Sequence, residues 1–225
     1  MAFMKTNSVK ITVDNNTYDS LEDFGLAIEN TDYLKSPQQS LANIVSVPGR
    51  DGMLDMTDPV FGGQYFMSRK INIKFGGMEE SENWDSVIST FRNLFEGKVV
   101  KLEFATMPGW YWTGRAEINS FQHRRALGMF SLDIPDADPF CYQDHTLTKY
   151  ASNSGTSVTI SITRKIAVPT ITVNTITRIE KDGVTYTFDA GTHRNPELRL
   201  LPGNNTLILK GPGNQVTIDY QDGSL

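Results

Sequence analysis

The chain has 225 residues and a net charge of −5 at pH 7, with hydrophobic residues at 39% and charged residues at 21%. This composition is too apolar for a disordered chain and too polar for a membrane protein. The negative charge argues against a dedicated nucleic-acid binder, because phosphate recognition needs a positive surface. One cysteine, Cys141, excludes an internal disulfide framework and a multi-cysteine zinc site. We therefore expect a folded, soluble protein with no cofactor, no metal site and no membrane contact.

Short antiparallel strands are predicted through the first part of the chain, because apolar and polar residues alternate between turns of Gly, Asn, Asp and Pro. Val9, Ile11 and Val13 open this pattern. Asp14-Asn15-Asn16 then supplies turn residues that tolerate a left-handed φ, which predicts a hairpin into residues 18–28. Further strands are predicted at 44–47, 66–75, 99–104, 115–122 and 127–134.

The segment 81–96 breaks this rhythm, because its apolar residues recur at the spacing of one helix face. These residues are Trp84, Val87, Ile88, Phe91, Leu94 and Phe95. Ser81 can cap the start of the helix, and Gly97 can end it in the left-handed conformation. We expect the apolar face to pack on a sheet, with Trp84, Ile88, Phe91 and Phe95 in the core.

A domain boundary is predicted near residue 140, where an aromatic and charged sequence changes to one rich in Thr, Ser, Ile and Val. Strands are predicted after it at 157–162, 170–179, 184–188, 197–200, 206–210 and 216–220. A single flat sheet could not bury its apolar face, so these strands predict a small sandwich. The expected fold is mainly β, with a sandwich-like domain at 1–140 that carries the helix and a smaller β-sandwich at 141–225.

Catalytic signatures are absent from the sequence, which contains neither a nucleophile elbow nor a glycine-rich phosphate or dinucleotide loop. We therefore expect no enzymatic activity, although a glycan hydrolase with a carboxylate pair remains an alternative. The stretch Trp110-Tyr111-Trp112 places three large rings on adjacent residues, so in a strand they alternate between faces. Exposed rings of this kind stack on sugars or anchor protein interfaces. The alternative interpretation is that a helix or loop of the same domain covers these three rings.

A short motif in the first domain resembles a known family. The motif consists of Val47-Pro48-Gly49-Arg50-Asp51-Gly52-Met53-Leu54-Asp55, followed by Tyr65 and by Arg69-Lys70-Ile71. It is similar to the N-terminal pattern of the distal tail proteins of long-tailed, siphovirus-type bacteriophages and prophages. Gly49 and Gly52 permit a tight turn. Arg50 and Arg69 can pair with carboxylates at a subunit boundary.

The order of the later segments agrees with this resemblance. Pro108-Gly109-Trp110-Tyr111-Trp112-Thr113-Gly114-Arg115 resembles the family's aromatic-Gly-Arg segment. Two later segments resemble the family's C-terminal end, where a galectin-like sandwich is expected. They are Leu201-Pro202-Gly203-Asn204-Asn205-Thr206 and Val216-Thr217-Ile218-Asp219-Tyr220. The candidate interface or turn residues are Gly49, Arg50, Gly52, Arg69, Trp110 and Trp112.

The resemblance implies a structural protein of the viral tail tip, or baseplate. Its N-terminal domains would form a ring, usually a hexamer, that joins the tail tube to the host-adsorption apparatus and leaves a channel through which DNA passes without specific binding. Tail tube protein and tail-tip or receptor-binding proteins would be its partners. Because the N-terminus lacks the apolar segment of a signal peptide, assembly into the virion tail is expected in the cytoplasm of the bacterial host. A carbohydrate-binding protein that grips cell-wall glycan, through the second sandwich or through Trp110 and Trp112, is the alternative.

Overall fold

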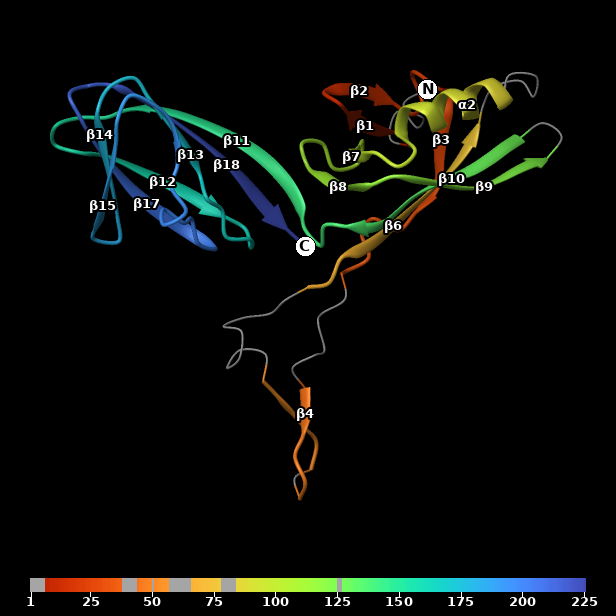
Figure 1. The fold of residues 1–225 in the computed structure, drawn as a ribbon, viewed down its shortest axis with the longest axis horizontal. Coiled ribbons are helices and arrows are strands. Elements are labelled where there is room, and N and C mark those ends of the chain that lie inside the picture. The colour runs from red at the N-terminus through yellow and green to blue at the C-terminus, as the bar shows by residue number, and fades with distance from the viewer. Residues whose placement is uncertain (1–6, 38–43, 50, 57–65, 78–83, 125–126) are drawn as a thin grey trace. The chain divides into compact units, whose positions relative to one another are not determined.

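The structure, a computed structural model, describes residues 7–37, 44–49, 51–56, 66–77, 84–124 and 127–225 (Figure 1). The chain divides into two compact units, Met1–Pro139 and Phe140–Leu225, called here the N-terminal and C-terminal units. Strands make up most of the described residues, which contain one helix, so the mainly β prediction is confirmed. None of the described helical residues forms a segment long and apolar enough to cross a membrane.

Two four-stranded antiparallel arrangements build the N-terminal unit. One has the strand order β8-β7-β1-β2 and the other the order β3-β6-β10-β9. The first comprises β1 (Val9–Val13), β2 (Asn16–Asp19), β7 (Val99–Phe104) and β8 (Tyr111–Arg115). The second comprises β3 (Leu26–Thr31), β6 (Arg69–Gly77), β9 (Glu117–Arg124) and β10 (Leu127–Ala137). A separate two-stranded sheet pairs β4 (Ile44–Ser46) with β5 (Met53–Asp55).

The first hairpin follows from its turn residues. Asp14 and Asn15 both have positive φ, at 47° and 65°, and Val13 pairs with Asn16, so β1 and β2 are joined by the two-residue turn that matches strand twist. The predicted continuation of the second strand through residues 18–28 is wrong. The Asp19 carboxylate accepts the main-chain N–H groups of Leu21 and Glu22 at 2.9 and 3.2 Å, which turns the chain toward β3 in the other sheet.

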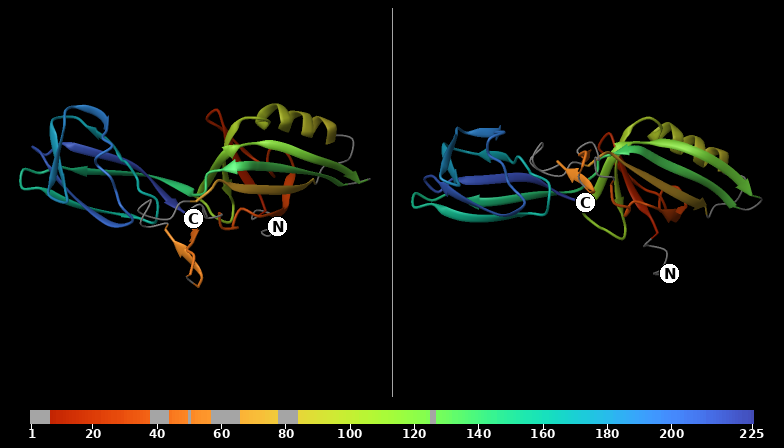
Figure 2. Two further views of the ribbon diagram at one scale, coloured as in Figure 1. Left: turned by 60° about the horizontal axis from the view of Figure 1, so that its bottom comes forward. Right: turned by 90° about the horizontal axis from the view of Figure 1, so that it is seen from below.

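The helix α2 (Trp84–Phe95) buries Trp84, Ile88, Phe91 and Phe95, so the predicted buried face is confirmed. The Phe91 ring centroid lies 5.0 Å from that of Phe130 in β10, and Figure 2 shows α2 running over β9 and β10. Gly97 has a φ of 70° and ends the helix as expected. The proposed cap at Ser81 lies outside the described residues. Rings from α2 and from both sheets therefore share one core.

The C-terminal unit is a sandwich of two antiparallel sheets. One contains strands in the order β16-β13-β18-β11 and the other in the order β12-β17-β14-β15. Their bounds are β11 (Cys141–Tyr150), β12 (Thr156–Ile162), β13 (Thr170–Val173), β14 (Thr177–Lys181), β15 (Val184–Phe188), β16 (Gly191–Arg194), β17 (Gly203–Lys210) and β18 (Gln215–Ser224). Ile171 and Ile218 of the first sheet share a buried cluster with Ile160 and Leu207 of the second. The predicted β-sandwich is therefore present.

Two strand predictions in the C-terminal unit are wrong. The segment 170–179 is two strands, β13 and β14, which lie in different sheets. The alternation of buried residues with less buried ones stays in phase from β13 to β14, so it does not reveal the turn between them. In that turn the Thr177 hydroxyl donates to the main-chain oxygen of Thr175 at 2.9 Å. The segment 197–200 is not a strand, because the Asn195 side chain accepts the Glu197 N–H at 2.9 Å and forms a turn.

Candidate assembly interface

The Gly49 to Gly52 motif lies at the tip of an exposed hairpin formed by β4 and β5. Val45 pairs with Leu54 and Ser46 with Met53. Gly49 and Gly52 both have a φ of 81°, a left-handed conformation that favours glycine. A Cβ atom at either position would meet no atom within 4 Å, so backbone conformation and not crowding requires glycine there. Arg50 lies outside the described residues.

No residue of the hairpin whose side chain is described, between 45 and 56, is buried. Val45 is 48% exposed and Val47 is 37% exposed. Among the described strands, β4 and β5 pair only with each other. A two-stranded hairpin with no buried face is only marginally stable in water. The hairpin therefore offers free strand edges and apolar side chains to a further surface.

Arg69 closes the base from which this hairpin departs. The chain leaves β3 through residues 32–37 and returns to β6, where Arg69 is the first residue. The side chain is 6% exposed. Its Nη2 atom donates to the main-chain oxygen of Tyr33 at 2.6 Å and to that of Lys35. Arg69 thus ties the departing chain to the returning chain inside its own unit, and its pairing with carboxylates at a subunit boundary stays a prediction.

Trp112 supports the same base from the core. Its ring meets the Tyr33 ring edge-on at 5.1 Å, and the Tyr33 ring stacks on Phe104 at 3.9 Å. The Tyr33 hydroxyl also hydrogen-bonds to Thr106 Oγ1 at 2.6 Å. Trp112 is 2% exposed, so it belongs to the core and the prediction of an exposed interface or sugar-stacking ring is wrong for it. Trp110, just before β8, is half-buried.

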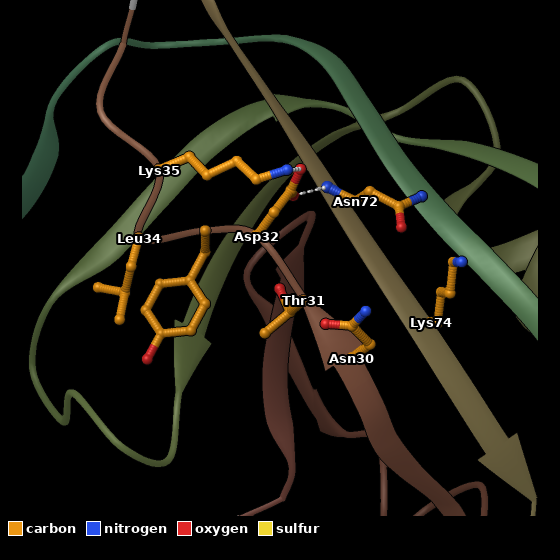
Figure 3. Close-up of a pocket in the computed structure, with 8 residues that line it drawn as sticks. Asn30, Thr31, Asp32, Leu34, Lys35, Asn72 and Lys74 are labelled. Carbon is orange, nitrogen blue, oxygen red and sulfur yellow. Dashed lines mark hydrogen bonds and ion pairs between the residues drawn. The ribbon is translucent and has the colours of Figure 1, made fainter.

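The outer side of this base is a polar hollow of about 570 Å³ (Figure 3). Its lining residues are Asn30, Thr31, Asp32, Tyr33, Leu34, Lys35, Asn72 and Lys74. The Asp32 carboxylate accepts the Asn72 N–H at 2.6 Å and pairs with the Lys35 ammonium at 3.1 Å. These bonds hold residues 32–35 against β6. Leu34 is 70% exposed beside them.

The lining of this hollow forms no metal-binding group among the described residues. Nowhere in the described part of the chain do three His, Cys, Asp or Glu side chains gather in a group that could hold a metal ion. Asp32 and Lys35 neutralise each other in the hollow. The arrangement instead fixes the path of the chain into and out of the hairpin.

Sequence reasoning selected two parts of this arrangement and missed the residue that joins them. Arg69 and Trp112 meet through Tyr33, one by its main-chain oxygen and the other by its ring. Gly49 and Gly52 lie together in the hairpin tip. The signal for Tyr33 was weak, because a single aromatic residue between Asp32 and Leu34 fits no strand or helix period.

Comparison with solved structures supports the fold, whereas the comparisons by sequence found nothing. No protein-family model matches the chain, and no curated protein gives a significant match. The crystal structure of the SPP1 Dit (gp 19.1) protein, described as a paradigm of the hub adsorption apparatus in phages that infect Gram-positive bacteria, superposes with a TM-score of 0.67. The identity is 16%, over 96% of this chain and 99% of that one. The two proteins share their fold across both units. A de novo designed double-stranded β-helix aligns with 36% of this chain at a TM-score of 0.25, too low to carry an argument.

Proposed function

We propose that the protein is a structural component of a phage tail tip, a hub that assembles by contact and performs no catalysis. The observation that carries this function is the exposed hairpin of β4 and β5, none of whose described side chains at 45–56 is buried. The fold shared with the SPP1 hub protein supports the same role. The proposal also follows the Gly49-Arg50-Asp51-Gly52 motif, which resembles the distal tail proteins.

In the proposed assembly, the hairpin of one N-terminal unit packs on a neighbouring unit. The hairpin and the surface that receives it differ, so the contact is head-to-tail, and such contacts make a ring when the rotation closes. Six copies is the number that the family resemblance favours. The ring would join the tail tube to the receptor-binding proteins of the tail tip, in the virion tail.

DNA would pass through the centre of this ring without specific binding. The chain carries a net charge of −5, and an excess of negative charge around a channel repels the phosphate backbone. The C-terminal sandwich would stay outside the ring contact and remain available to other tail-tip proteins.

The experiment replaces residues 44–55 with a Gly-Ser-Gly linker and compares the solution mass of the two proteins. The parent should form a closed oligomer with annular particles in negative stain. The shortened protein should form no ring and no annular particles, yet retain its tryptophan fluorescence and unfolding midpoint, because no described side chain of the hairpin is buried. A shortened protein that assembles like the parent would contradict the role of the hairpin.

A further inference from the structure

The strand β12 is an edge of its sheet, because in the order β12-β17-β14-β15 it pairs only with β17. Pairing runs through all seven residues, from Thr156 opposite Leu209 to Ile162 opposite Gly203, with no bulge. Apart from this ladder, no main-chain hydrogen bond joins β12 to another main-chain group of the described residues. One side of β12 therefore presents N–H and C=O groups with no main-chain partner among the described residues, although the Ile160 oxygen accepts the Asn205 side-chain amide at 3.4 Å.

The edge strands β3, β9 and β16 carry features that prevent pairing with another molecule. The edge strand β3 contains Glu29, and its register shifts between Ile28 and Asn30. The edge strand β9 contains Glu117, and its pairing with β10 includes a bulge. The short strand β16 ends at Arg194.

None of these features is present in β12, whose sequence Thr-Ser-Val-Thr-Ile-Ser-Ile contains no charged residue and no proline. The opposite edge, β15, is also uncharged, but it has five residues and its Tyr186 hydroxyl donates to the main-chain oxygen of Glu197 at 3.2 Å. That bond links β15 to the neighbouring turn. Of the two edges of this sheet, β12 is thus the longer, with seven residues against five.

The sequence of β12 is complementary to itself in an antiparallel arrangement centred on Thr159. In that register Thr159 faces its own copy, Val158 faces Ile160, and Ser157 faces Ser161. Val158 and Ile160 are buried on the inner face, and Ser157, Thr159 and Ser161 are exposed on the outer face. These three pairs match like with like, whereas the end pair places Thr156 opposite Ile162. Hydroxyl pairs across neighbouring strands stabilise their pairing.

The charges that flank β12 are also compatible with this register. Arg164 and Lys165 follow the strand, and in the antiparallel arrangement they would lie opposite Ser154 and Asn153 of the other copy. No like charges face each other across the pair. An isologous contact with a two-fold axis at Thr159 satisfies both strands equally.

We propose that β12 pairs with β12 of a second copy of this chain, which joins two four-stranded sheets into one continuous sheet across a two-fold axis. The contact uses the C-terminal unit, whereas the proposed ring contact uses the hairpin of the N-terminal unit. The two contacts are therefore independent, and each can fail without the other.

Disulfide trapping in the full chain tests the register directly. Opposite residues of an antiparallel pair have Cα atoms roughly 4.5–5.5 Å apart, within the range of a disulfide. Thr159→Cys should therefore give a covalent dimer under mild oxidation. Ser157→Cys alone should not, because its own copy would lie about 14 Å away along the strand, but a mixture of Ser157→Cys and Ser161→Cys chains should. The native Cys141 is 2% exposed, so it contributes little background.

The control places the same cysteine on the neighbouring strand. Thr206 pairs with Thr159 and is exposed, but it lies on the central strand β17, so Thr206→Cys should give no covalent dimer on oxidation. Thr159→Lys should abolish the non-covalent contact between C-terminal units, while Thr206→Lys should retain it. A Thr159→Cys chain that cross-links no more than Thr206→Cys would overturn the proposal, as would equal cross-linking of Ser157→Cys alone. Annular particles formed by Thr159→Lys would show that ring assembly is separate.

Discussion

Replacing Arg69 with Met tests the claim that this side chain closes the base of the hairpin. Methionine is close to the arginine stem in length and keeps much of its packing, but it cannot donate hydrogen bonds. The main-chain oxygens of Tyr33 and Lys35 would each lose the Nη2 donor. The segment that leads to the hairpin would then be held chiefly by the Tyr33 ring and by Asp32.

The size of the effect follows from these bonds. Hydrogen bonds to a charged group contribute about 1.5–3 kcal/mol each. The third contact, from Nη1 to the main-chain oxygen of Pro139, is 3.4 Å long and adds little. Two lost bonds give an expected decrease of about 3–6 kcal/mol in the free energy of unfolding of the N-terminal unit.

Urea denaturation followed by tryptophan fluorescence measures this loss. All three tryptophans of the chain, Trp84, Trp110 and Trp112, belong to the N-terminal unit, so the signal excludes the C-terminal unit. Lys70→Met is the matched control, because it introduces the same side chain at the next residue, which is exposed. It should change stability by no more than about 0.5 kcal/mol. Equal stabilities of the two variants would refute the structural role of Arg69.

Three further predictions concern the helix and the two turns. Phe91→Ala should cost about 3–5 kcal/mol by the same fluorescence assay, because the side chain is fully buried, with a relative exposure of 0%. Exposed Arg92→Ala should cost no more than about 0.5 kcal/mol, and a Phe91→Ala protein as stable as the parent would mean that the apolar face is not core. Asn15→Val should destabilise the N-terminal unit by about 1–2 kcal/mol, because Asn15 has a φ of 65° that a β-branched residue tolerates poorly; unchanged stability would contradict this. Gly49→Val should weaken ring assembly about tenfold through strain at a φ of 81°, measured by the concentration dependence of the solution mass. Exposed Asp51→Ala is its control, and equal assembly of these two variants would show that the turn conformation is unimportant.

The helix and the first hairpin could be predicted because each depends on local chemistry. The spacing of Trp84, Ile88, Phe91 and Phe95 identifies a buried helix face wherever the helix packs. Asp14 and Asn15 tolerate positive φ, so the turn is encoded in the residues that form it. Gly49 and Gly52 adopt the conformation that made them candidates for a tight turn.

The features that were predicted wrongly or missed depend on contacts between distant residues, which the spacing of apolar residues along the chain does not encode. Val173 and Thr177 fit one continuous period-two pattern, although they belong to β13 and β14, which lie in different sheets. The pattern therefore predicted one strand where the structure has two. The strand β11 was not predicted, because polar residues such as Gln143 and His145 occupy its inner face. Trp112 could not be distinguished from an exposed ring, because its cover, Tyr33, lies far away in the chain.

The mass of the full chain carrying Thr159→Lys, which removes the proposed β12 contact, tests ring assembly most directly when it is measured by native mass spectrometry across a range of concentrations. A hub ring of six copies predicts a discrete species of about 150 kDa, built from a chain of 25.2 kDa. Its population should rise with concentration and disappear when residues 44–55 are replaced. A single species at 25.2 kDa at every concentration would contradict the account.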